Sequence, residues 1–549
     1  MKTRNKFKLL SLLIPSVAII SSCSSGPLVP SSVTPTSSES SSEAISSSAP
    51  SSEPSVSSEP AISSEVSSET SSLPPSSSSE EPIVGNDKYR TYYQLLVYSF
   101  ADSDGDGIGD FKGIADKLDY LENLGIQGIW LSPVLKASSY HAYDTEDYYT
   151  INPKYNAKIN GKTYDIKYLL DECHKRDIKV LMDLVLNHTS YNHTWYKEHR
   201  DWYGYDDRFG FPEFNFDISA PRNAVKEVGQ YWLNQGFDGF RLDAAMWIYN
   251  SGSNRHNKNY QFWSEWCSAM RETKDDCYLI AEVLDSNHDL AYQYANAGFD
   301  STFDFNTVGN VVNMVKNNNK NYATLTANNI KKASDINPNY ILGRALSNHD
   351  IGRFNQSHPD SSDKAYYVEN INQIKLANAV NALTPGNTFI YYGDEIGLKG
   401  TCEGTAKDWY YDMNFRTPMP WISERTDSVK YFENFHDSGV TTSVTFSGKS
   451  IEQDVNDDSS IYSCLKRALH VKNNSVVLQR GTVSAIPNLD SSLNGFDVTL
   501  NGTTIRVVVN CTNKTIDYTI NDQVLYTLKA TISNNVASLS QYSLVAYQL

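Results

Sequence analysis

Acidic, basic and histidine side chains directly follow several short apolar segments of this chain, a placement that suits catalysis. Arg241 and Asp243 stand two residues apart in FDGFRLDA, so on a β-strand both side chains point to the same side. An arginine beside an aspartate favours the ionised carboxylate, which is the form that acts as a nucleophile. Glu282 ends the apolar run CYLIAE, where burial would keep a carboxyl group protonated and able to donate its proton. These residues therefore offer one ionised and one protonated carboxyl group.

Further polar residues occupy the same kind of position, namely Asp183, Asn187, His188, His349 and Asp350. A single aspartate at a strand end is more often a helix cap than a catalyst, and a single histidine could be a hydrogen-bonded surface residue. Several carboxylates with two histidines and an arginine, all at predicted strand ends, favour an active site. Two carboxyl groups of unequal acidity that face each other across a cleft are what hydrolysis of a glycosidic bond requires.

The segments that must position these residues alternate between strand-like and helix-like patterns. Short apolar segments predict eight strands, at 92–100, 126–133, 178–188, 237–244, 277–283, 299–305, 339–350 and 386–395. Helix-period stretches lie between them, and clear examples are 111–125, 164–177 and 221–236. This alternation predicts an α/β fold with a parallel sheet, and eight repeats favour a (β/α)8 TIM barrel. Such a barrel carries its reactive groups at the C-terminal ends of its strands.

The sequence divides into four regions. Residues 83–476 form the predicted barrel, with a long loop at 132–163 and a short inserted loop domain, domain B, at about 188–217 after the third strand. Residues 477–549 contain short alternating strands at 495–511, 515–520 and 542–549, which predict a C-terminal antiparallel β-sandwich domain. Residues 24–82 are nearly all Ser, Glu and Pro, a composition that predicts a disordered tether.

Residues 1–23 have the form of a bacterial export signal, in which a basic start precedes the apolar run LLSLLIPSVAII. This run is short and contains Pro15, and no other apolar stretch reaches the ~18 residues of a membrane span, which disfavours a transmembrane helix. The ending ISSC resembles a lipobox, which implies a signal peptide that ends there and a lipid on Cys23. We therefore expect a lipoprotein, which is held by its tether at the extracellular face of the bacterial membrane.

The composition narrows the choice of partners. The formal net charge is −17 and no basic run follows the export signal, which disfavours nucleic acid. The cysteines after Cys23 stand at 173, 267, 277, 402, 464 and 511, and no CxxC pair suggests zinc. Their scatter favours buried thiols, with a bridge between Cys267 and Cys277 left open. A monomer is expected.

A glycine-rich loop, ADSDGDGIGD at 101–110, crowds together carboxylates that repel one another, namely Asp102, Asp104, Asp106 and Asp110. Such crowding is tolerable around a hard divalent cation with oxygen ligands, and calcium is the natural candidate. The first half of the loop resembles an EF-hand, but Gly113 stands where that motif needs its bidentate glutamate. The loop is therefore predicted to bind calcium within a different fold.

Four stretches together resemble the signature regions of the α-amylase family, glycoside hydrolase family 13. They are DLVLNH (183–188), GFRLDAA (239–245), AEVLD (281–285) and LSNHD (346–350), in the family's order. The similarity extends to HAYDTEDYYTINPKY (141–155), FPEFN (211–215), YYGDEIG (391–397) and RTPMPW (416–421). It covers the chain from about residue 89 to the C-terminus. The resemblance implies an extracellular enzyme that cleaves α-1,4-glucosidic bonds in starch and maltooligosaccharides with retention of configuration.

The resemblance also implies roles for individual residues. Asp243 would be the nucleophile, Glu282 the general acid/base and Asp350 the stabiliser of the transition state. The substrate-binding set would comprise His141, Tyr143, Asp183, His188, Arg241, Trp247, His349 and Arg353. Within this set Asp183 would orient Arg241, and Arg353 would hold a more distal sugar. A structural calcium ion would be held by Asp102, Asp104, Asp106 and Asp110 and by the backbone carbonyl of Ile108.

The sequence also departs from the family pattern. Many members have Lys-His shortly after the nucleophile, whereas this chain has Met246-Trp247. This difference changes the residues on the leaving-group side of the cleft, and it argues against a second calcium site beside Asn187. Segment 188–217 is short for the family's inserted domain. The leading interpretation is an α-amylase, and neopullulanase, oligo-1,6-glucosidase or transglycosylase activity is the alternative within the family. A non-catalytic glucan-binding lipoprotein is the alternative from another class, and the complete set of catalytic residues argues against it.

Overall fold

The computed structural model describes residues 88–204, 209–357, 367–403, 411–421, 441–445, 451–520 and 522–549. The predicted export signal at 1–23 and tether at 24–82 lie outside these residues. Within the described part of the chain, no helix combines the length and the apolar character needed to span a bilayer.

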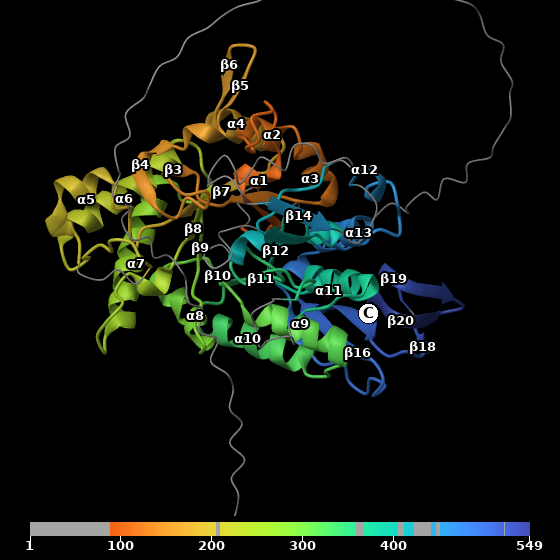
Figure 1. Cartoon of the computed structure of the whole chain (residues 1–549). Coiled ribbons are helices and arrows are strands. Elements are labelled where there is room, and N and C mark those ends of the chain that lie inside the picture. The colour runs from red at the N-terminus through yellow and green to blue at the C-terminus, as the bar shows by residue number, and fades with distance from the viewer. Residues whose placement is uncertain are drawn as a thin grey trace, which may run out of the picture. The chain divides into compact units, whose positions relative to one another are not determined.

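Eight parallel strands close into a barrel (Figure 1). In chain order they are β1 (Tyr92–Leu95), β2 (Gly128–Leu131), β7 (Lys179–Leu184), β8 (Gly239–Leu242), β9 (Tyr278–Ala281), β10 (Ser301–Phe303), β11 (Ile341–Ala345) and β12 (Asn387–Tyr391). Each strand pairs with its successor, and β12 pairs with β1 to close the ring. The predicted (β/α)8 barrel is confirmed. Every strand lies inside one of the eight predicted segments but is shorter, because pairing stops where the connections diverge from the barrel.

Alternate strand residues fill the inside of the barrel. Tyr92, Trp130, Leu181 and Phe389 belong to one buried cluster there, and the rings of Tyr92 and Phe389 stack with centroids 4.9 Å apart. Gly128 leaves room for this stack, since a Cβ atom at that position would lie 2.4 Å from Cε1 of Tyr92. The interior is therefore a packed core, on which the polar residues at the strand ends rest.

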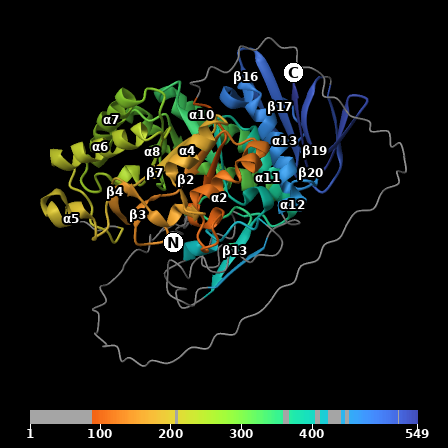
Figure 2. The same ribbon diagram turned by 90° about the horizontal axis from the view of Figure 1, so that it is seen from above.

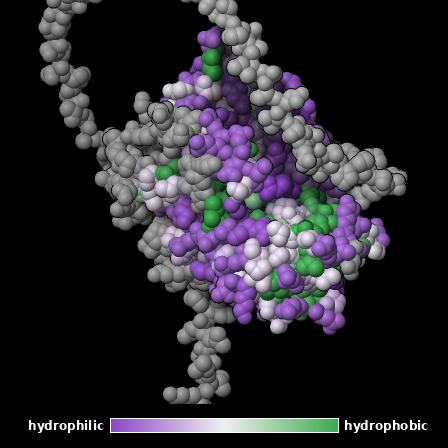
Figure 3. Space-filling model, turned by 90° about the vertical axis from the view of Figure 1, so that its right-hand side faces the viewer, coloured by the Kyte–Doolittle hydropathy of each residue, from purple (hydrophilic) through white to green (hydrophobic). Residues whose placement is uncertain are grey.

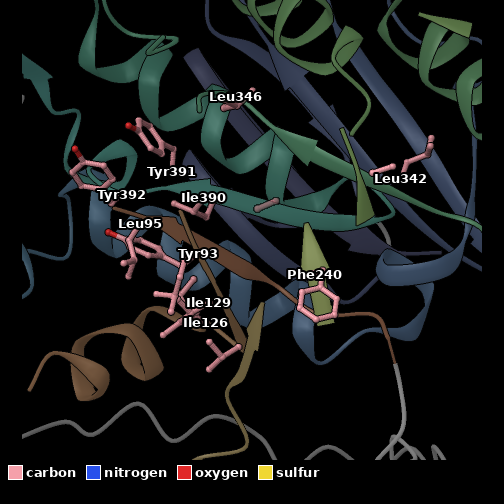
Figure 4. Packing of buried hydrophobic residues seen from close by; sticks show 14 of the residues in the cluster. Tyr93, Leu95, Ile126, Ile129, Phe240, Leu342, Leu346, Ile390, Tyr391 and Tyr392 are labelled. Atoms are coloured by element: carbon pink, nitrogen blue, oxygen red, sulfur yellow. The ribbon is translucent and has the colours of Figure 1, made fainter. Parts of the chain in front are cut away.

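Helices surround the barrel (Figures 1 and 2), and the remaining strand residues share one buried cluster with residues of these helices. Figure 4 shows Tyr93, Leu95 and Ile129 close together beside the strands that carry them, and all three are fully buried. The longer helices are α4 (Ile166–His174), α6 (Ser219–Asn234), α7 (Arg255–Thr273), α9 (Asn306–Asn317), α10 (Tyr322–Ile336), α11 (Ile371–Leu383) and α13 (Ile461–Asn473). Short helices are α8 (Asp289–Gln293), α12 (Ile451–Asp454) and α14 (Val476–Arg480).

Two predicted elements near the start of the barrel are wrong in detail. Only the first part of segment 92–100 is strand, because Val97–Phe100 forms a helical turn, α1. The amide of Ser99 donates a hydrogen bond to the Leu96 carbonyl at the start of this turn. The predicted helix 111–125 is two helices, α2 (Phe111–Ala115) and α3 (Leu118–Leu124), which break at Asp116 and Lys117. Gly125 ends α3 in the left-handed conformation, which glycine adopts at little steric cost.

The long connections carry small structures of their own. Loop 132–163 and the residue after it contain two hairpins, β3 (Leu135–Ala137) with β4 (Thr145–Ile151) and β5 (Ala157–Ile159) with β6 (Lys162–Tyr164), and η1 (Pro153–Tyr155). Segment 188–217 follows β7 and holds α5 (Thr194–Glu198) and η2 (Arg200–Trp202). Single bridges join His188 to Glu213 and Tyr203 to Phe214. After β12 come η5 (Asp394–Ile396), the hairpin β13 (Lys399–Glu403) with β14 (Thr441–Thr445), and η6 (Tyr411–Asn414).

The C-terminal β domain is one six-stranded antiparallel sheet. Its strands are β15 (Thr482–Ser484), β16 (Asn494–Leu500), β17 (Thr503–Asn510), β18 (Ile516–Thr519), β19 (Val524–Ser533) and β20 (Val536–Gln548). Successive residues of β17 alternate between two buried clusters, with Val507 in the core shared with the barrel and Val508 in a core of the sheet's own. The Tyr526 hydroxyl donates to the Cys464 carbonyl of α13 at 3.1 Å. The sheet is therefore fastened to the barrel helices.

The surface is largely hydrophilic on the face that Figure 3 shows, and the described cysteines are free thiols. Figure 3 shows the face at the right of Figure 1, where hydrophilic residues predominate and hydrophobic ones form small groups. Cys173, Cys267, Cys277, Cys402, Cys464 and Cys511 are all free. The open question of a bridge between Cys267 and Cys277 is thus answered, since the structure holds both as thiols.

Candidate active site

One arginine lies between the carboxylates of three neighbouring strands. Nη1 of Arg241 lies 2.8 Å from Oδ1 of Asp183 and 2.7 Å from Oδ1 of Asp243, and its Nη2 lies 3.0 Å from Oε1 of Glu282. Asp183 on β7 and Arg241 on β8 are direct register partners. The structure therefore brings together four residues that the sequence predicted for the site.

The arginine is fixed from below by the aromatic interior. Its side chain is 1% exposed and lies over the ring of Trp130, 5.3 Å from the ring centroid. The Trp130 indole N–H and the Tyr143 hydroxyl donate to Oδ2 of Asp183 at 3.2 and 3.0 Å. A buried guanidinium is costly unless it is paired and hydrogen-bonded, and the surrounding carboxylates meet this need.

The backbone after β8 turns sharply to join the two proposed reacting carboxyl groups. Ala244 adopts φ +47°, a left-handed conformation that is uncommon for a residue with a side chain. Its amide then donates to Oε2 of Glu282 at 2.9 Å, and the amide of Ala245 donates to the Glu282 carbonyl at 3.1 Å. The Trp263 indole holds the turn by donating to the Ala245 carbonyl at 2.8 Å. The turn thus sets where Glu282 lies relative to Asp243.

The electrostatics of the carboxylates differ from the simple expectation. Burial raises the pKa of Asp243 well above its usual range, and Arg241 opposes this rise. Burial likewise raises the pKa of Asp183 to about 6, again against Arg241. From the sequence, Asp243 was expected beside Arg241, and the resemblance implied that Asp183 orients it. The contact of the same guanidinium with Glu282, inside a desolvated barrel, was not expected.

Two buried histidines border this group in the neutral form. Nδ1 of His349 accepts from the Gln94 amide at 2.6 Å, so its proton is on Nε2, which contacts the Tyr143 hydroxyl and lies 3.0 Å from Oδ2 of Asp350. Burial lowers the pKa of His349 far below neutrality. Burial also lowers the pKa of His188 to about 4, and this ring stacks on Phe211.

The structure adds residues that sequence reasoning missed. Nη2 of Arg416 lies 3.1 Å from Oδ1 of Asp350, and Nη1 donates to the Tyr140 hydroxyl at 3.1 Å. Gln94 on β1 and Trp130 on β2 were also not predicted, although both lie inside the barrel at strand positions. Arg416 opens RTPMPW, a stretch already noted for its similarity, and this was the one signal that could have identified it.

The remaining predicted residues lie less directly at the carboxylates. Nδ1 of His141 accepts from the amide of Tyr143 at 3.1 Å, which fixes the turn between them. The half-buried ring of Trp247 faces the guanidinium of Arg255, 4.6 Å from the ring centroid. The Asn187 amide group donates to the Trp247 carbonyl at 2.6 Å, which ties the ends of β7 and β8 together directly.

Arg353 differs from the expectation that it holds a distal sugar. Its side chain is 0% exposed and pairs with Asp394 at 3.4 Å. Its guanidinium also donates to the carbonyls of Tyr392 and Phe415 at 2.8 and 3.1 Å. These contacts place Arg353 behind the site, where it fastens the segment that follows β12.

The acidic loop gathers three of its predicted metal ligands. Asp102, Asp104 and Asp106 each offer a carboxylate oxygen, and these oxygens lie within 4.8 Å of one another. Oδ1 of Asp104 is buried and makes no hydrogen bond. Burial raises the pKa of Asp106, and the neighbouring Asp104 and Asp102 add to that rise. An orphaned carboxylate oxygen among like charges fits a hard cation such as calcium.

Two other predicted ligands of this loop are placed differently. Oδ1 of Asp110 accepts from the amide of Gly113 and Oδ2 from the amide of Ser103, both at 2.7 Å, so Asp110 caps helix α2. Its carboxylate lies outside the group formed by the other three aspartates. Ile108 lies within the same turn, with its amide 2.8 Å from Oδ1 of Asp106.

An eight-stranded parallel barrel with an arginine between carboxylates at the C-terminal ends of its strands defines a class, the TIM-barrel enzymes, and its two carboxyl groups are compatible with chemistry on a glycosidic bond. The family model described as "Alpha amylase, catalytic domain" matches residues 94–208 and 199–481. The chain belongs to the α-amylase family, glycoside hydrolase family 13, and is thus a glycoside hydrolase or transferase.

Relatives within the family carry different activities in their names. "Alpha-amylase 3" of Dictyoglomus thermophilum is 31% identical, over 84% of this chain and 93% of its own length. A 4-alpha-glucanotransferase of Thermotoga maritima is 27% identical over 68% of this chain and 84% of its own. An oligo-1,6-glucosidase of Parageobacillus thermoglucosidasius is 25% identical over 82% of this chain and 94% of its own length. Among solved structures, Eubacterium rectale Amy13B superposes with a TM-score of 0.71 at 27% identity, covering 84% of this chain and 96% of its own.

Proposed function

We propose that this protein is a retaining α-amylase that cleaves α-1,4-glucosidic bonds in starch, maltodextrins and related α-glucans. One observation carries the proposal: Arg241 contacts Asp243 at 2.7 Å and Glu282 at 3.0 Å, so two carboxyl groups from adjacent strands flank one space. Similarity to an α-amylase over 84% of the chain supports the choice of substrate.

The proposed reaction is a double displacement. Glu282 protonates the glycosidic oxygen while Asp243 attacks the anomeric carbon and forms a covalent glycosyl-enzyme. Glu282 then takes a proton from water, which attacks the same carbon and releases the product with its original configuration. Arg241 supports the first step because it favours ionised Asp243 against the effect of burial.

Further residues complete the proposed site. Asp350 stabilises positive charge that develops on the sugar in the transition state. Neutral His349 and His188, with Tyr143, offer hydrogen bonds and a ring face to the sugar at the cleavage point without adding a competing positive charge. Trp247 supplies a flat surface on the leaving-group side, and its stack on Arg255 keeps the ring in one orientation.

A structural calcium ion in the acidic loop belongs to the same proposal. Asp102, Asp104 and Asp106 would hold it, and it would neutralise their mutual repulsion. The loop lies between β1 and α2 and supplies no group to the carboxylates of the active site, so the ion's contribution is to stability. The amide of Lys158 donates to Oδ2 of Asp104 at 2.9 Å, which couples the β5–β6 hairpin to the loop.

The N-terminal region completes the biological proposal. An export signal with a lipid on Cys23, followed by a Ser/Glu/Pro-rich tether, would place the enzyme at the outer face of the cell membrane. The enzyme would there meet α-glucan polymers and oligosaccharides outside the cell as a monomer.

The test is a product profile of the purified enzyme on amylose, pullulan and isomaltose. Maltooligosaccharides from amylose, with isomaltose left intact, support α-amylase activity. Cleavage of isomaltose or pullulan in preference to amylose favours the oligo-1,6-glucosidase or neopullulanase alternative, and the 25% identical oligo-1,6-glucosidase gives that alternative its weight. Products longer than the substrate, when maltotriose is supplied, indicate glucan transfer. If none of these substrates releases sugar, the protein is a glucan-binding protein without catalytic activity.

A further inference from the structure

Arg416 holds one of the proposed catalytic carboxylates from outside the barrel. Its Nη2 lies 3.1 Å from Oδ1 of Asp350, and its Nε donates to the backbone carbonyl of His349 at 3.0 Å. A single planar guanidinium thus fixes both the Asp350 side chain and the peptide unit before it. We propose that Arg416 is a positioning residue that orients Asp350 for catalysis. The inference rests on the proposed role of Asp350.

Hydrogen bonds other than those of Arg416 also fix the backbone around Asp350. Oδ1 of Asn348 accepts from the amides of Asp350 and Ile351 at 2.8 and 2.6 Å, which forms a tight turn after β11. The Asp350 side chain is 32% exposed, and its other oxygen contacts Nε2 of His349 at 3.0 Å. His349 is neutral, so among the residues that the structure describes Arg416 is the cationic group that holds this carboxylate. The turn fixes the backbone position of Asp350, and Arg416 fixes the direction in which the Asp350 carboxylate points.

The segment that presents Arg416 is fastened on both sides of it. The Phe415 carbonyl accepts from the guanidinium of Arg353 at 3.1 Å and from the hydroxyl of Tyr391 at 2.9 Å. The Thr417 carbonyl accepts from the hydroxyl of Tyr392 at 2.7 Å. All three donors are buried: Tyr391 ends β12, Tyr392 follows it, and Arg353 belongs to the turn after β11. Arg416 therefore reaches the site from a backbone that is already positioned.

The Arg416 side chain has further partners that limit its motion. It is 6% exposed, lies 5.8 Å from the ring centroid of Tyr140 and donates to the Tyr140 hydroxyl at 3.1 Å. Nη2 also lies 3.2 Å from Oδ2 of Asp412, whose side chain is 49% exposed. A guanidinium that is buried, stacked and bonded on each nitrogen is preorganised, and preorganised charge acts on a reacting centre without further rearrangement.

The experiment compares Arg416→Ala, Arg416→Lys, Asp350→Asn and the double variant Arg416→Ala/Asp350→Asn on an activated aryl α-maltoside. We expect Arg416→Ala to lower kcat by about 100-fold with KM changed less than about threefold, because the loss falls on the transition state. Arg416→Lys should recover part of kcat, since an ammonium keeps the charge but cannot hold Asp350 and the His349 carbonyl together. In the Asp350→Asn background, Arg416→Ala should cost less than about threefold, because the group it positions is already gone.

A matched control is Arg506→Ala, which removes an arginine that pairs with Asp497 at 2.7 Å in the C-terminal sheet. Arg506→Ala should leave kcat unchanged, which would show that the loss of an arginine ion pair does not by itself lower kcat. The proposal is overturned if Arg416→Ala or Arg416→Lys keeps the parent kcat, or if the losses from Arg416→Ala and Asp350→Asn add fully. Should Arg416→Ala not fold, Arg416→Lys and its combination with Asp350→Asn carry the same test. An active Asp350→Asn enzyme would instead refute the proposed role of Asp350, a different result.

Discussion

Nη1 of Arg241 lies 2.7 Å from Oδ1 of Asp243, and the two residues project from the same side of one strand. The same nitrogen lies 2.8 Å from Oδ1 of Asp183. Because Arg241 is shared in this way, a substitution at Asp243 removes the reacting carboxylate while leaving the arginine its other partners.

Asp243→Asn should lower kcat by at least about 1,000-fold, because an amide cannot form the glycosyl-enzyme. The melting temperature should stay within about 4 °C of the parent value, since the shape of the side chain is kept. Activity on an aryl α-maltoside and calorimetry give the two values, with Asp335→Asn on the surface of α10 as the control. Substantial turnover by a verified preparation would contradict the role given to Asp243.

Hydrolysis should retain the anomeric configuration. Retaining enzymes hold the two carboxyl groups about 5–5.5 Å apart, which leaves no room for a water molecule between nucleophile and sugar. Proton NMR of the first product should show the α anomer before mutarotation. A β anomer as the first product, or carboxyl groups about 9 Å apart in a crystal structure, would show inversion instead.

Asp238, which directly precedes β8, should make stability depend on pH. Burial acts to raise the pKa of Asp238, but hydrogen bonds from His174, Lys274 and the Val180 amide, together with the charge of Lys274, outweigh it and hold the pKa well below its usual range. A depressed folded pKa stabilises the protein above the unfolded value of about 3.9, and this stabilisation is lost as the pH falls toward the folded pKa.

Asp238→Asn should therefore lower the free energy of unfolding by about 2–3 kcal/mol at pH 7, and by less below about pH 4. Urea unfolding of the parent and the variant at pH 7 and pH 3 measures both differences. An equal difference at the two pH values would show that Asp238 acts through packing rather than through its charge.

Calcium should stabilise the enzyme without taking part in turnover. The melting temperature should rise with free calcium, because an ion that binds only the folded state shifts the equilibrium toward it. Chelation should lower the melting temperature before it changes kcat at low temperature. Asp106→Ala should melt lower and lose the calcium response, whereas Asp335→Ala should keep it. A parent enzyme that ignores both calcium and chelator would show the loop to be an ordinary acidic turn.

Removal of residues 1–82 should give a soluble enzyme with unchanged kcat and KM on short maltooligosaccharides. These residues contain the export signal and the Ser/Glu/Pro-rich stretch, which has too little apolar content to dock on the barrel. Kinetics and calorimetry on the truncated and the mature protein make the comparison. A fall in kcat or melting temperature on truncation would reveal a contact that the composition does not predict.

Residues close in the chain could be placed from the sequence, and distant partners could not. The two-residue spacing of Arg241 and Asp243 required a common side of the strand, and their ion pair bears this out. Arg416 reaches Asp350 across 66 positions, through a segment whose course depends on side chains from β12. Val97–Phe100 was predicted as strand because a short apolar run fits a buried strand and a buried helical turn equally well.

Arg353 and Asp110 show a second reason for such errors. Each residue type suits a ligand contact, but the structure gives the Arg353 guanidinium to backbone carbonyls and the Asp110 carboxylate to helix α2. Spacing identifies which groups could react, whereas competition among neighbouring donors and acceptors decides what they bind. That competition is resolved only in three dimensions.

The Arg241 group lies on barrel strands above the packed core, whereas His141, Trp247 and Arg416 stand on connections outside those strands. Apart from Tyr143 and Arg416, which contact Asp183 and Asp350, a change in a connection therefore alters the surroundings of the proposed sugar site while the Arg241 group keeps its geometry. The relatives carry different activities in their names. For protein engineering this division defines two sets of positions: variation at 132–163, 188–217 and 411–421, with Tyr143, His188 and Arg416 kept, explores bond and chain-length preference, and the strand residues beneath are best left constant.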